Sequence, residues 1–151
     1  MNGRKQIWIR KATEKDIDKI KLIADANRDA IGFVLRPKIE FALKRGELLV
    51  ATTRNGRVIG FVNYHHRRDV QTTLYEICVK KEHRKNGVGR KLIRALIEES
   101  KTVGKKKILL KCPESLKANG FYRKLCFKNI AKENGRKRRL NVWTLYLEEV
   151  I

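Results

Sequence analysis

The stretch LYEICVKKEHRKNGVGRK, residues 74–91, decides the fold of this chain. Its first six residues are typical of a strand, and apolar positions recur through 88–103 with the period of a helix. Gly87 and Gly89 stand between the two elements, where they let the backbone turn tightly and approach a ligand. The first amides of a helix have no intrahelical partner and carry partial positive charge, so this junction predicts a phosphate-binding loop.

Two nucleotide-binding motifs do not fit this junction. A Rossmann fingerprint needs a third glycine three residues on, where Leu92 stands, and no Gly-Lys-Ser/Thr completes a P-loop. The remaining alternative to a phosphate site is an ordinary solvated loop between a strand and a helix.

The rest of the chain alternates between strand and helix signals. Thr13 with Asp16 resembles a helix N-cap with an acidic partner, Pro37 fits the first turn of a second helix, and Asn55-Gly56 is a strong hairpin signal. We expect strands at 7–10, 48–53, 58–64, 72–80, 108–110, 127–131 and 142–147, and helices at 13–29, 37–46, 88–103 and 118–125.

This order, β-α-α-β-β-β-α-β-α-β-β, predicts an α/β fold. An antiparallel meander followed by a β-α-β crossover makes a mixed sheet with helices on both faces. The 151 residues are enough for a single domain with its own core, spanning 1–151.

Composition excludes several classes of protein. With 42% hydrophobic residues the chain can bury a core, so disorder is not expected. Cys78, Cys112 and Cys126 are widely spaced and odd in number, which indicates neither a disulfide framework nor a zinc site. No apolar run approaches the roughly 20 residues of a membrane span, so we expect a cytoplasmic protein with no metal and no membrane partner.

The charge is the most unusual feature of the composition. Lysines and arginines number 37 against 16 acidic residues, a formal net charge of +21. Heat-adapted proteins are rich in lysine, but they usually carry glutamates to match. A nucleic acid or another polyanion is therefore a candidate partner.

Residues 84–89 resemble the pyrophosphate-binding signature Arg/Gln-x-x-Gly-x-Gly/Ala of the Gcn5-related N-acetyltransferase (GNAT) superfamily. The resemblance extends to Ile-Arg-Lys-Ala-Thr at 9–13, Leu-Val-Ala at 49–51, Val-Ile-Gly-Phe-Val at 58–62 and Ala-Asn-Gly-Phe-Tyr at 118–122, and so covers nearly the whole chain. It implies a GNAT fold with a central sheet that splays beyond Ile108. It also implies an N-acetyltransferase that moves an acetyl group from acetyl-CoA to a primary amine by direct attack.

The resemblance implies a set of cofactor-binding residues. Main-chain groups at the end of the central strand would bind the pantetheine, and the loop with the start of the next helix would bind the pyrophosphate. The full set is Ile77, Cys78, Val79, Arg84, Lys85, Asn86, Gly87, Val88, Gly89, Arg90, Lys91, Asn119 and Tyr122.

Two residues are candidates for catalysis. Tyr122 stands where the family commonly has a phenol that protonates the departing thiolate; the alternative is an aromatic that packs the last helix on the sheet. Glu76 is the candidate base, directly or through water, and its alternative is a salt bridge. His65 and His66 end the preceding strand, close to the expected mouth of the site. Neighbouring side chains of a strand point to opposite faces, so at most one of the two histidines reaches the site directly. Cys126 replaces the usual glycine of the family, so the turn there is expected to differ slightly.

Basic residues are expected to border the acceptor side of the site as a substrate or polyanion rim: Arg67, Arg68, Arg136, Lys137, Arg138 and Arg139. A solvated face is the alternative. Such a rim favours an acceptor that is neutral, anionic or associated with nucleic acid. Two further functions stay open, a ribosomal-protein or N-terminal α-amine acetyltransferase, and a non-catalytic nucleic-acid-binding module with a GNAT fold. We expect a monomer or homodimer.

Overall fold

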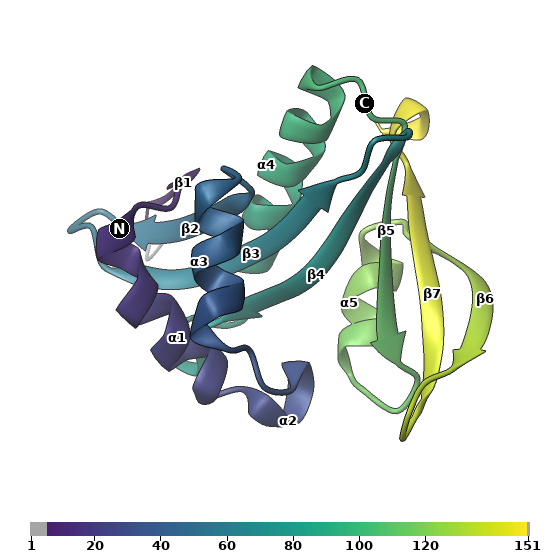
Figure 1. Cartoon of the computed structure of the whole chain (residues 1–151), viewed down its shortest axis with the longest axis horizontal. Helices are drawn as coiled ribbons and strands as arrows, with labels where there is room; N and C mark the ends of the chain where they lie inside the picture. The colour runs from purple at the N-terminus through teal and green to yellow at the C-terminus, as the bar shows by residue number, and fades with distance from the viewer. Residues whose placement is uncertain (1–5, 151) are drawn as a thin grey trace. The chain divides into compact units, whose positions relative to one another are not determined.

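The computed structural model describes residues 6–150 (Figure 1). They form two compact units. The first contains residues up to 65 together with 76–96, and the second contains 66–75 together with the residues from 97 onward. The expectation of one domain stays a prediction.

The first unit consists of three antiparallel strands and the helices that cover them. Its elements are β1 (Ile7–Lys11), a 3-10 turn (Glu14–Asp16), α1 (Ile17–Asp25), α2 (Arg28–Ile31), α3 (Arg36–Lys44), β2 (Leu48–Thr53), β3 (Val58–His66), the end of β4 (Gln71–Val79) and the start of α4 (Val88–Thr102). β1 pairs with β2 and β2 with β3. The Asn55-Gly56 hairpin is confirmed, and Gly56 has the positive φ of 82° that such a turn requires.

Helices lie on both faces of this part of the sheet. Phe61 packs into a buried cluster with Ile20 of α1 and Ile39 of α3. At the neighbouring Gly60, a side chain would point the other way, 3.4 Å from Leu92 of α4. Successive strand residues face opposite sides, so α4 covers the face that α1 and α3 leave open.

The second unit contains the other end of the sheet. Its further elements are β5 (Lys107–Pro113), α5 (Ala118–Lys124), β6 (Lys128–Asn134), β7 (Arg139–Tyr146) and a closing 3-10 turn (Leu147–Glu149). β5 is parallel to β4 and antiparallel to β7, and β6 is antiparallel to β7. The hydrogen-bonded order β1-β2-β3-β4-β5-β7-β6 confirms the expected mixed α/β sheet. No helix of the described residues is long and apolar enough to cross a membrane.

The expected helix at 13–29 is wrong in its extent. It divides into a 3-10 turn, α1 and the four-residue α2. The break lies at Asn27, whose side-chain amide donates 2.7 Å to the carbonyl of Ile23. An asparagine that bonds locally to backbone competes with the helical pattern, which explains the break. The strand expected at 108–110 is also longer, and runs over Lys107–Pro113.

The start of the first helical segment depends on a buried carboxylate. Asp16 accepts a hydrogen bond from the Thr13 amide at 2.8 Å and two from the Arg10 guanidinium at 2.7 and 3.0 Å. Burial opposes the ionisation of Asp16, but the hydrogen bonds from Arg10 and Thr13 outweigh it and lower its pKa. The expected pairing of Thr13 with Asp16 is therefore confirmed, with Arg10 as an additional partner.

Replacing this carboxylate should make stability less dependent on pH. A folded-state pKa below the unfolded value gives stability that is present above about pH 4 and lost as the pH falls through the folded pKa. We expect Asp16→Asn to cost about 2 kcal/mol at pH 7, and the difference from wild type to shrink below about pH 4. Urea unfolding at several pH values measures it. Asp18→Asn, which removes an exposed carboxylate nearby, is the control and should change little; an equal loss at every pH would contradict the account.

Candidate active site

The loop between β4 and α4 presents its backbone as the motif predicts. β4 ends at Val79, and α4 begins at Val88. Between them Lys85 has φ +67° and Gly87 has φ +80°, both in the left-handed region. The first amides of α4 have no intrahelical acceptor, so the loop and the helix start expose backbone donors suited to a phosphate. The left-handed Lys85 was not anticipated from the sequence.

Arg84 lies at the base of this loop. Its Nε donates to the carbonyl of Val79 at 3.2 Å, and a terminal nitrogen donates to the side-chain oxygen of Asn27. These contacts use two of the five guanidinium N–H groups, so Arg84 is oriented and still has donors for an anion. Arg90 and Lys91 are exposed at the start of α4.

A cavity of about 640 Å³ lies next to Arg84 within the first unit. Its lining combines apolar side chains with five cations and two carboxylates: Leu22, Ile23, Ala26, Ala30 and Val58, then Lys19, Arg57, Lys80, Lys81 and Arg84, with Asp29 and Glu82. The volume is within the range of about 300–1,000 Å³ of small-molecule sites. Its lining suits an anionic ligand with an apolar part.

Glu76 is buried on β4, with 7% of its surface exposed. Its Oε1 accepts 2.9 Å from the side-chain amide of Asn63, and its Oε2 accepts 2.7 Å from the ammonium of Lys38. The salt bridge that was considered as an alternative role is therefore present. This salt bridge does not exclude a role of Glu76 as base, because a carboxylate that takes a proton from an ammonium group must also contact that group.

Neither Asn63 nor Lys38 was anticipated as a site residue. Asn63 is the polar residue within the otherwise apolar run of β3, and a buried amide on a strand needs a polar partner. That signal was available in the sequence. Lys38 gave none, because a lysine on an exposed helix face is ordinary.

The other residues at the end of β4 have no ionised side chain. Cys78 is buried, and burial raises the pKa of its thiol to about 11, so it is protonated at neutral pH. It is thus a small buried hydrophobe rather than a nucleophile. Ile77 and Val79 are partly buried, and their main-chain contacts to a pantetheine stay a prediction.

The pairing of β4 with β5 ends early, as a splayed sheet requires. It covers Gln71–Lys107, Thr72–Ile108 and Thr73–Leu109. Within the second unit the pairing does not extend to Leu74 and Tyr75, although β5 runs on to Pro113. The edge of β4 beyond Thr73 therefore has backbone groups that β5 does not satisfy.

Tyr122 lies on α5 in the second unit and is buried in an aromatic cluster. Its ring centroid is 5.4 Å from that of Phe121, 5.7 Å from Phe127 and 6.5 Å from Trp143. This packing fixes the direction of the ring. It agrees with the packing role that was considered, and it also meets the need of a proton donor for a fixed position; the catalytic role stays a prediction.

Asn119 joins three elements of the second unit. Its side-chain nitrogen donates to the carbonyls of Pro113 at 2.9 Å and Leu116 at 2.7 Å, and its oxygen accepts from Asn141 at 2.9 Å and Trp143 Nε1 at 2.8 Å. A contact of this side chain with a cofactor therefore requires the exchange of an existing hydrogen bond.

The helix that carries Tyr122 ends in a Schellman motif. The Phe127 amide donates to the Tyr122 carbonyl at 3.1 Å, and the Cys126 amide donates to the Arg123 carbonyl at 3.0 Å. Cys126 has φ +71°, the conformation that a glycine adopts at this position. The expectation of a different turn is wrong; the turn keeps the conformation that favours glycine and holds it with a strained residue.

Cys126→Gly should therefore stabilise the protein. Relief of the left-handed strain is worth about 1–2 kcal/mol, and the greater freedom of glycine in the unfolded chain offsets about 0.4–1 kcal/mol of it. We expect a net gain of up to about 1 kcal/mol, measured by urea unfolding. Cys126→Ala, which keeps a Cβ at φ +71°, is the control and should give no such gain.

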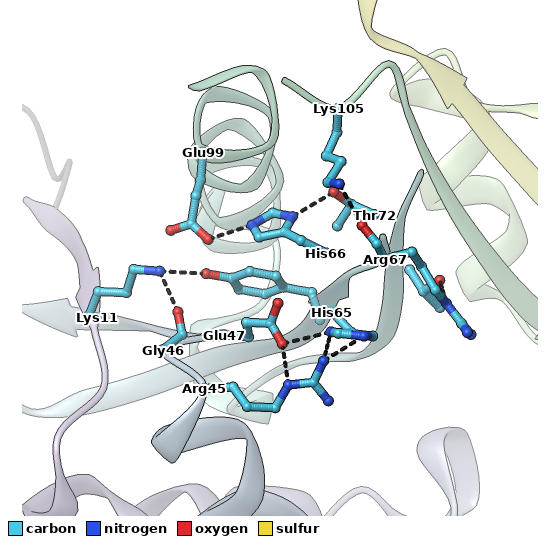
Figure 2. Close-up of polar contacts among 12 residues, drawn as sticks. Lys11, Arg45, Gly46, Glu47, His65, His66, Arg67, Thr72, Glu99 and Lys105 are labelled. Carbon is cyan, nitrogen blue, oxygen red and sulfur yellow. Dashed lines mark hydrogen bonds and ion pairs between the residues drawn. The ribbon is translucent and has the colours of Figure 1, made fainter. Parts of the chain in front are cut away.

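The two histidines at the end of β3 have separate carboxylate partners (Figure 2). His65 Nδ1 is 2.8 Å from Glu47, which also pairs with Arg45 in the first unit. His66 Nε2 is 2.9 Å from Glu99, and its Nδ1 is 2.8 Å from the Thr72 hydroxyl in the second unit. Both rings are thus already engaged.

The residues expected to form one basic rim lie in two places within the second unit. Arg67 and Arg68 precede β4, whose Gln71 pairs with Lys107 at the start of β5. The turn with Arg136, Lys137, Arg138 and Arg139 lies near Pro113 at the other end of β5. Six residue steps along a strand span about 20 Å, so the structure does not bring the two groups together.

Comparison with protein families gives the class of the protein. Residues 34–127 match the acetyltransferase (GNAT) family. The chain therefore belongs to this family, whose members are N-acetyltransferases. A comparison with curated protein sequences gave no significant match.

Solved structures of similar fold cover nearly the whole chain. Ard1 of Thermoplasma volcanium is 19% identical with a TM-score of 0.83, over 93% of this chain and 97% of that one. The ribosomal-protein-S18-alanine N-acetyltransferase of Escherichia coli is 21% identical with a TM-score of 0.77, over 94% of each chain. The protein yncA of Salmonella typhimurium, solved with its cofactor acetyl-CoA, is 23% identical with a TM-score of 0.78, over 97% of this chain and 96% of that one. These similarities show the fold.

Proposed function

We propose that this enzyme transfers the acetyl group of acetyl-CoA to a primary amine by direct attack of the amine on the thioester. The observation that carries the proposal is the loop of residues 84–90, in which two left-handed residues and the start of α4 expose backbone donors beside the oriented Arg84. This is the chemistry that a pyrophosphate requires. The cofactor supplies an acetyl group already activated as a thioester.

The amine must lose a proton before it can attack. For a lysine with a pKa near 10.4 the cost at pH 7 is about 4–5 kcal/mol, and for an α-amine near 8 it is about 1–1.5 kcal/mol. Glu76 is the carboxylate that takes this proton in our proposal, directly or through one water. Its two hydrogen bonds leave lone pairs on both oxygens, so an incoming ammonium has an acceptor.

Lys38 defines the kind of group that Glu76 binds. Its ammonium lies 2.7 Å from the Glu76 carboxylate and its side chain is half exposed. The carboxylate is thus placed to hold a primary ammonium. In our proposal the acceptor amine takes a similar position.

Tyr122 is the proton donor for the departing thiolate in this proposal. Its phenol O–H is a proton donor that a thiolate can accept from. The ring is held by Phe121, Phe127 and Trp143, which limits its motion.

Gly87→Ala should weaken acetyl-CoA binding. Gly87 has φ +80° with open space where a Cβ would lie, and a phosphate bound to the loop would fill that space. We expect at least about a tenfold rise in the dissociation constant, since a loss of 1.4 kcal/mol is tenfold. Isothermal titration calorimetry with acetyl-CoA measures it.

The matched control is Gly104→Ala at the end of α4, where φ is +82° and the space is also open. Both variants pay a similar backbone strain of about 1 kcal/mol, but only the first touches the loop. Equal cofactor affinity in the two folded variants would remove the basis for the phosphate site.

Tyr122→Phe should lower turnover by about 10²–10⁴-fold with little change in cofactor affinity, because only the proton donor is lost. The assay follows CoA release with two peptides as acceptors, one with a free α-amine and one whose only amine is a lysine. Glu76→Gln should lower turnover in the same range, and Tyr146→Phe, an exposed tyrosine of β7, is the control. Undiminished turnover in Tyr122→Phe would make Tyr122 a packing residue.

A further inference from the structure

The acetyl-transfer proposal does not account for most of the positive charge, and the structure gathers part of it at one place. Four basic residues lie on two turns of the second unit, the β3–β4 turn and the α4–β5 turn, and a fifth is the first residue of β5. We call this group the basic corner: Arg67, Arg68, Lys105, Lys106 and Lys107. None of the five forms an ion pair within the part of the chain that the structure describes.

The two turns are joined by hydrogen bonds, so the corner is rigid. The ammonium of Lys105 donates to the carbonyls of Arg67 at 2.5 Å and Asp69 at 2.7 Å (Figure 2). The Lys106 amide donates to the Val70 carbonyl at 2.7 Å. The backbones that carry the cations are therefore held side by side, which is a favourable starting point for an anion site.

The acidic side chains near the corner are already engaged. Asp69 accepts from the Gln71 amide at 2.9 Å, Glu99 contacts His66, and Glu149 pairs with Lys128. Asp69 keeps its charge, so the two turns and the first residue of β5 carry five cations against one carboxylate, a net charge of +4. The partner that it fits is an external anion.

An exposed aromatic ring lies beside the corner. Tyr146 of β7 is directly opposite Lys107 of β5, and opposite residues of an antiparallel pair share a face. Its side chain is 38% exposed, and the Lys128 ammonium lies 5.8 Å from its ring centroid. Cations next to an exposed aromatic form the pattern that binds single strands, in which a base stacks on the ring while basic groups contact phosphates.

We propose that the basic corner and Tyr146 bind single-stranded nucleic acid. Phosphates suit the corner better than carboxylates do, because exposed ion pairs contribute little, whereas a polyanion releases its condensed counterions on binding. Arg67 and Arg68 add planar guanidinium groups, and a guanidinium group can donate two parallel hydrogen bonds to one phosphate. This function is separate from acetyl transfer and does not depend on the cofactor loop.

The test measures the anisotropy of a fluorescent 12-nucleotide uridine RNA between 50 and 200 mM salt. If four cations each neutralise one phosphate, they contribute about −2.8 to the slope of the logarithm of the association constant against the logarithm of the salt concentration. A corner variant and a matched variant each replace two lysines and two arginines by glutamine. The corner variant is R67Q/R68Q/K106Q/K107Q, and the control, on exposed residues of the first unit, is K15Q/K44Q/R54Q/R94Q.

We expect the corner variant to flatten the slope by about 3 and the control to leave it nearly unchanged, while both bind acetyl-CoA as the wild type does. Lys105 is kept because it joins the two turns. If the two variants flatten the salt slope equally, the effect is one of general net charge and the proposal is overturned. An absence of RNA binding by the wild type at 50 mM salt would also overturn it.

A second substitution tests the stacking. Tyr146→Leu keeps an apolar side chain on β7 and should weaken binding about tenfold with no change in the salt slope. The same sequence presented as an RNA duplex should bind more weakly than the single strand. Equal binding of duplex and single strand, with no effect of Tyr146→Leu, would contradict the assignment to single strands.

Discussion

The backbone of β4 beyond Thr73 is the constraint on which the site depends. Six residues of this strand continue after its last pair with β5. A strand edge with unpaired N–H and C=O groups is a template for an extended ligand. The loop that we propose to bind phosphate follows directly on this edge, so in our proposal one strand end and one helix start supply both parts of the cofactor site.

Much of this arrangement is readable from the sequence, because it follows from local rules. The helix expected at 88–103 and the Asn55-Gly56 hairpin each rest on signals within a few residues, and both are present. The break at Asn27 was missed because its cause is a side chain that competes with the helix pattern. The partners of Glu76 were missed because they come from residues 13 and 38 positions away, and a single sequence holds no record of such contacts.

The ion pairs of the structure do not neutralise the positive charge of +21 evenly along the chain. Three acids of the second unit, Glu114, Glu133 and Glu149, pair with the lysines Lys132, Lys111 and Lys128 of β5 and β6. These pairs neutralise lysines of β5 and β6 and leave the cations of the basic corner without ion pairs among the described residues. Heat adaptation by ion-pair networks predicts the opposite, because there the added lysines have carboxylate partners. The distribution therefore favours a surface made for a polyanion.

The turn after α5 keeps a strained backbone conformation next to Tyr122, the proposed proton donor. Cys126 adopts a conformation that favours glycine, yet the two hydrogen bonds of the Schellman motif and the contact of Phe127 with Tyr122 hold it there. The same motif uses the carbonyl of Tyr122 and places Phe127 against its ring. Relaxing the turn would release both contacts, so the strain at Cys126 is stabilised by the interactions that orient the tyrosine.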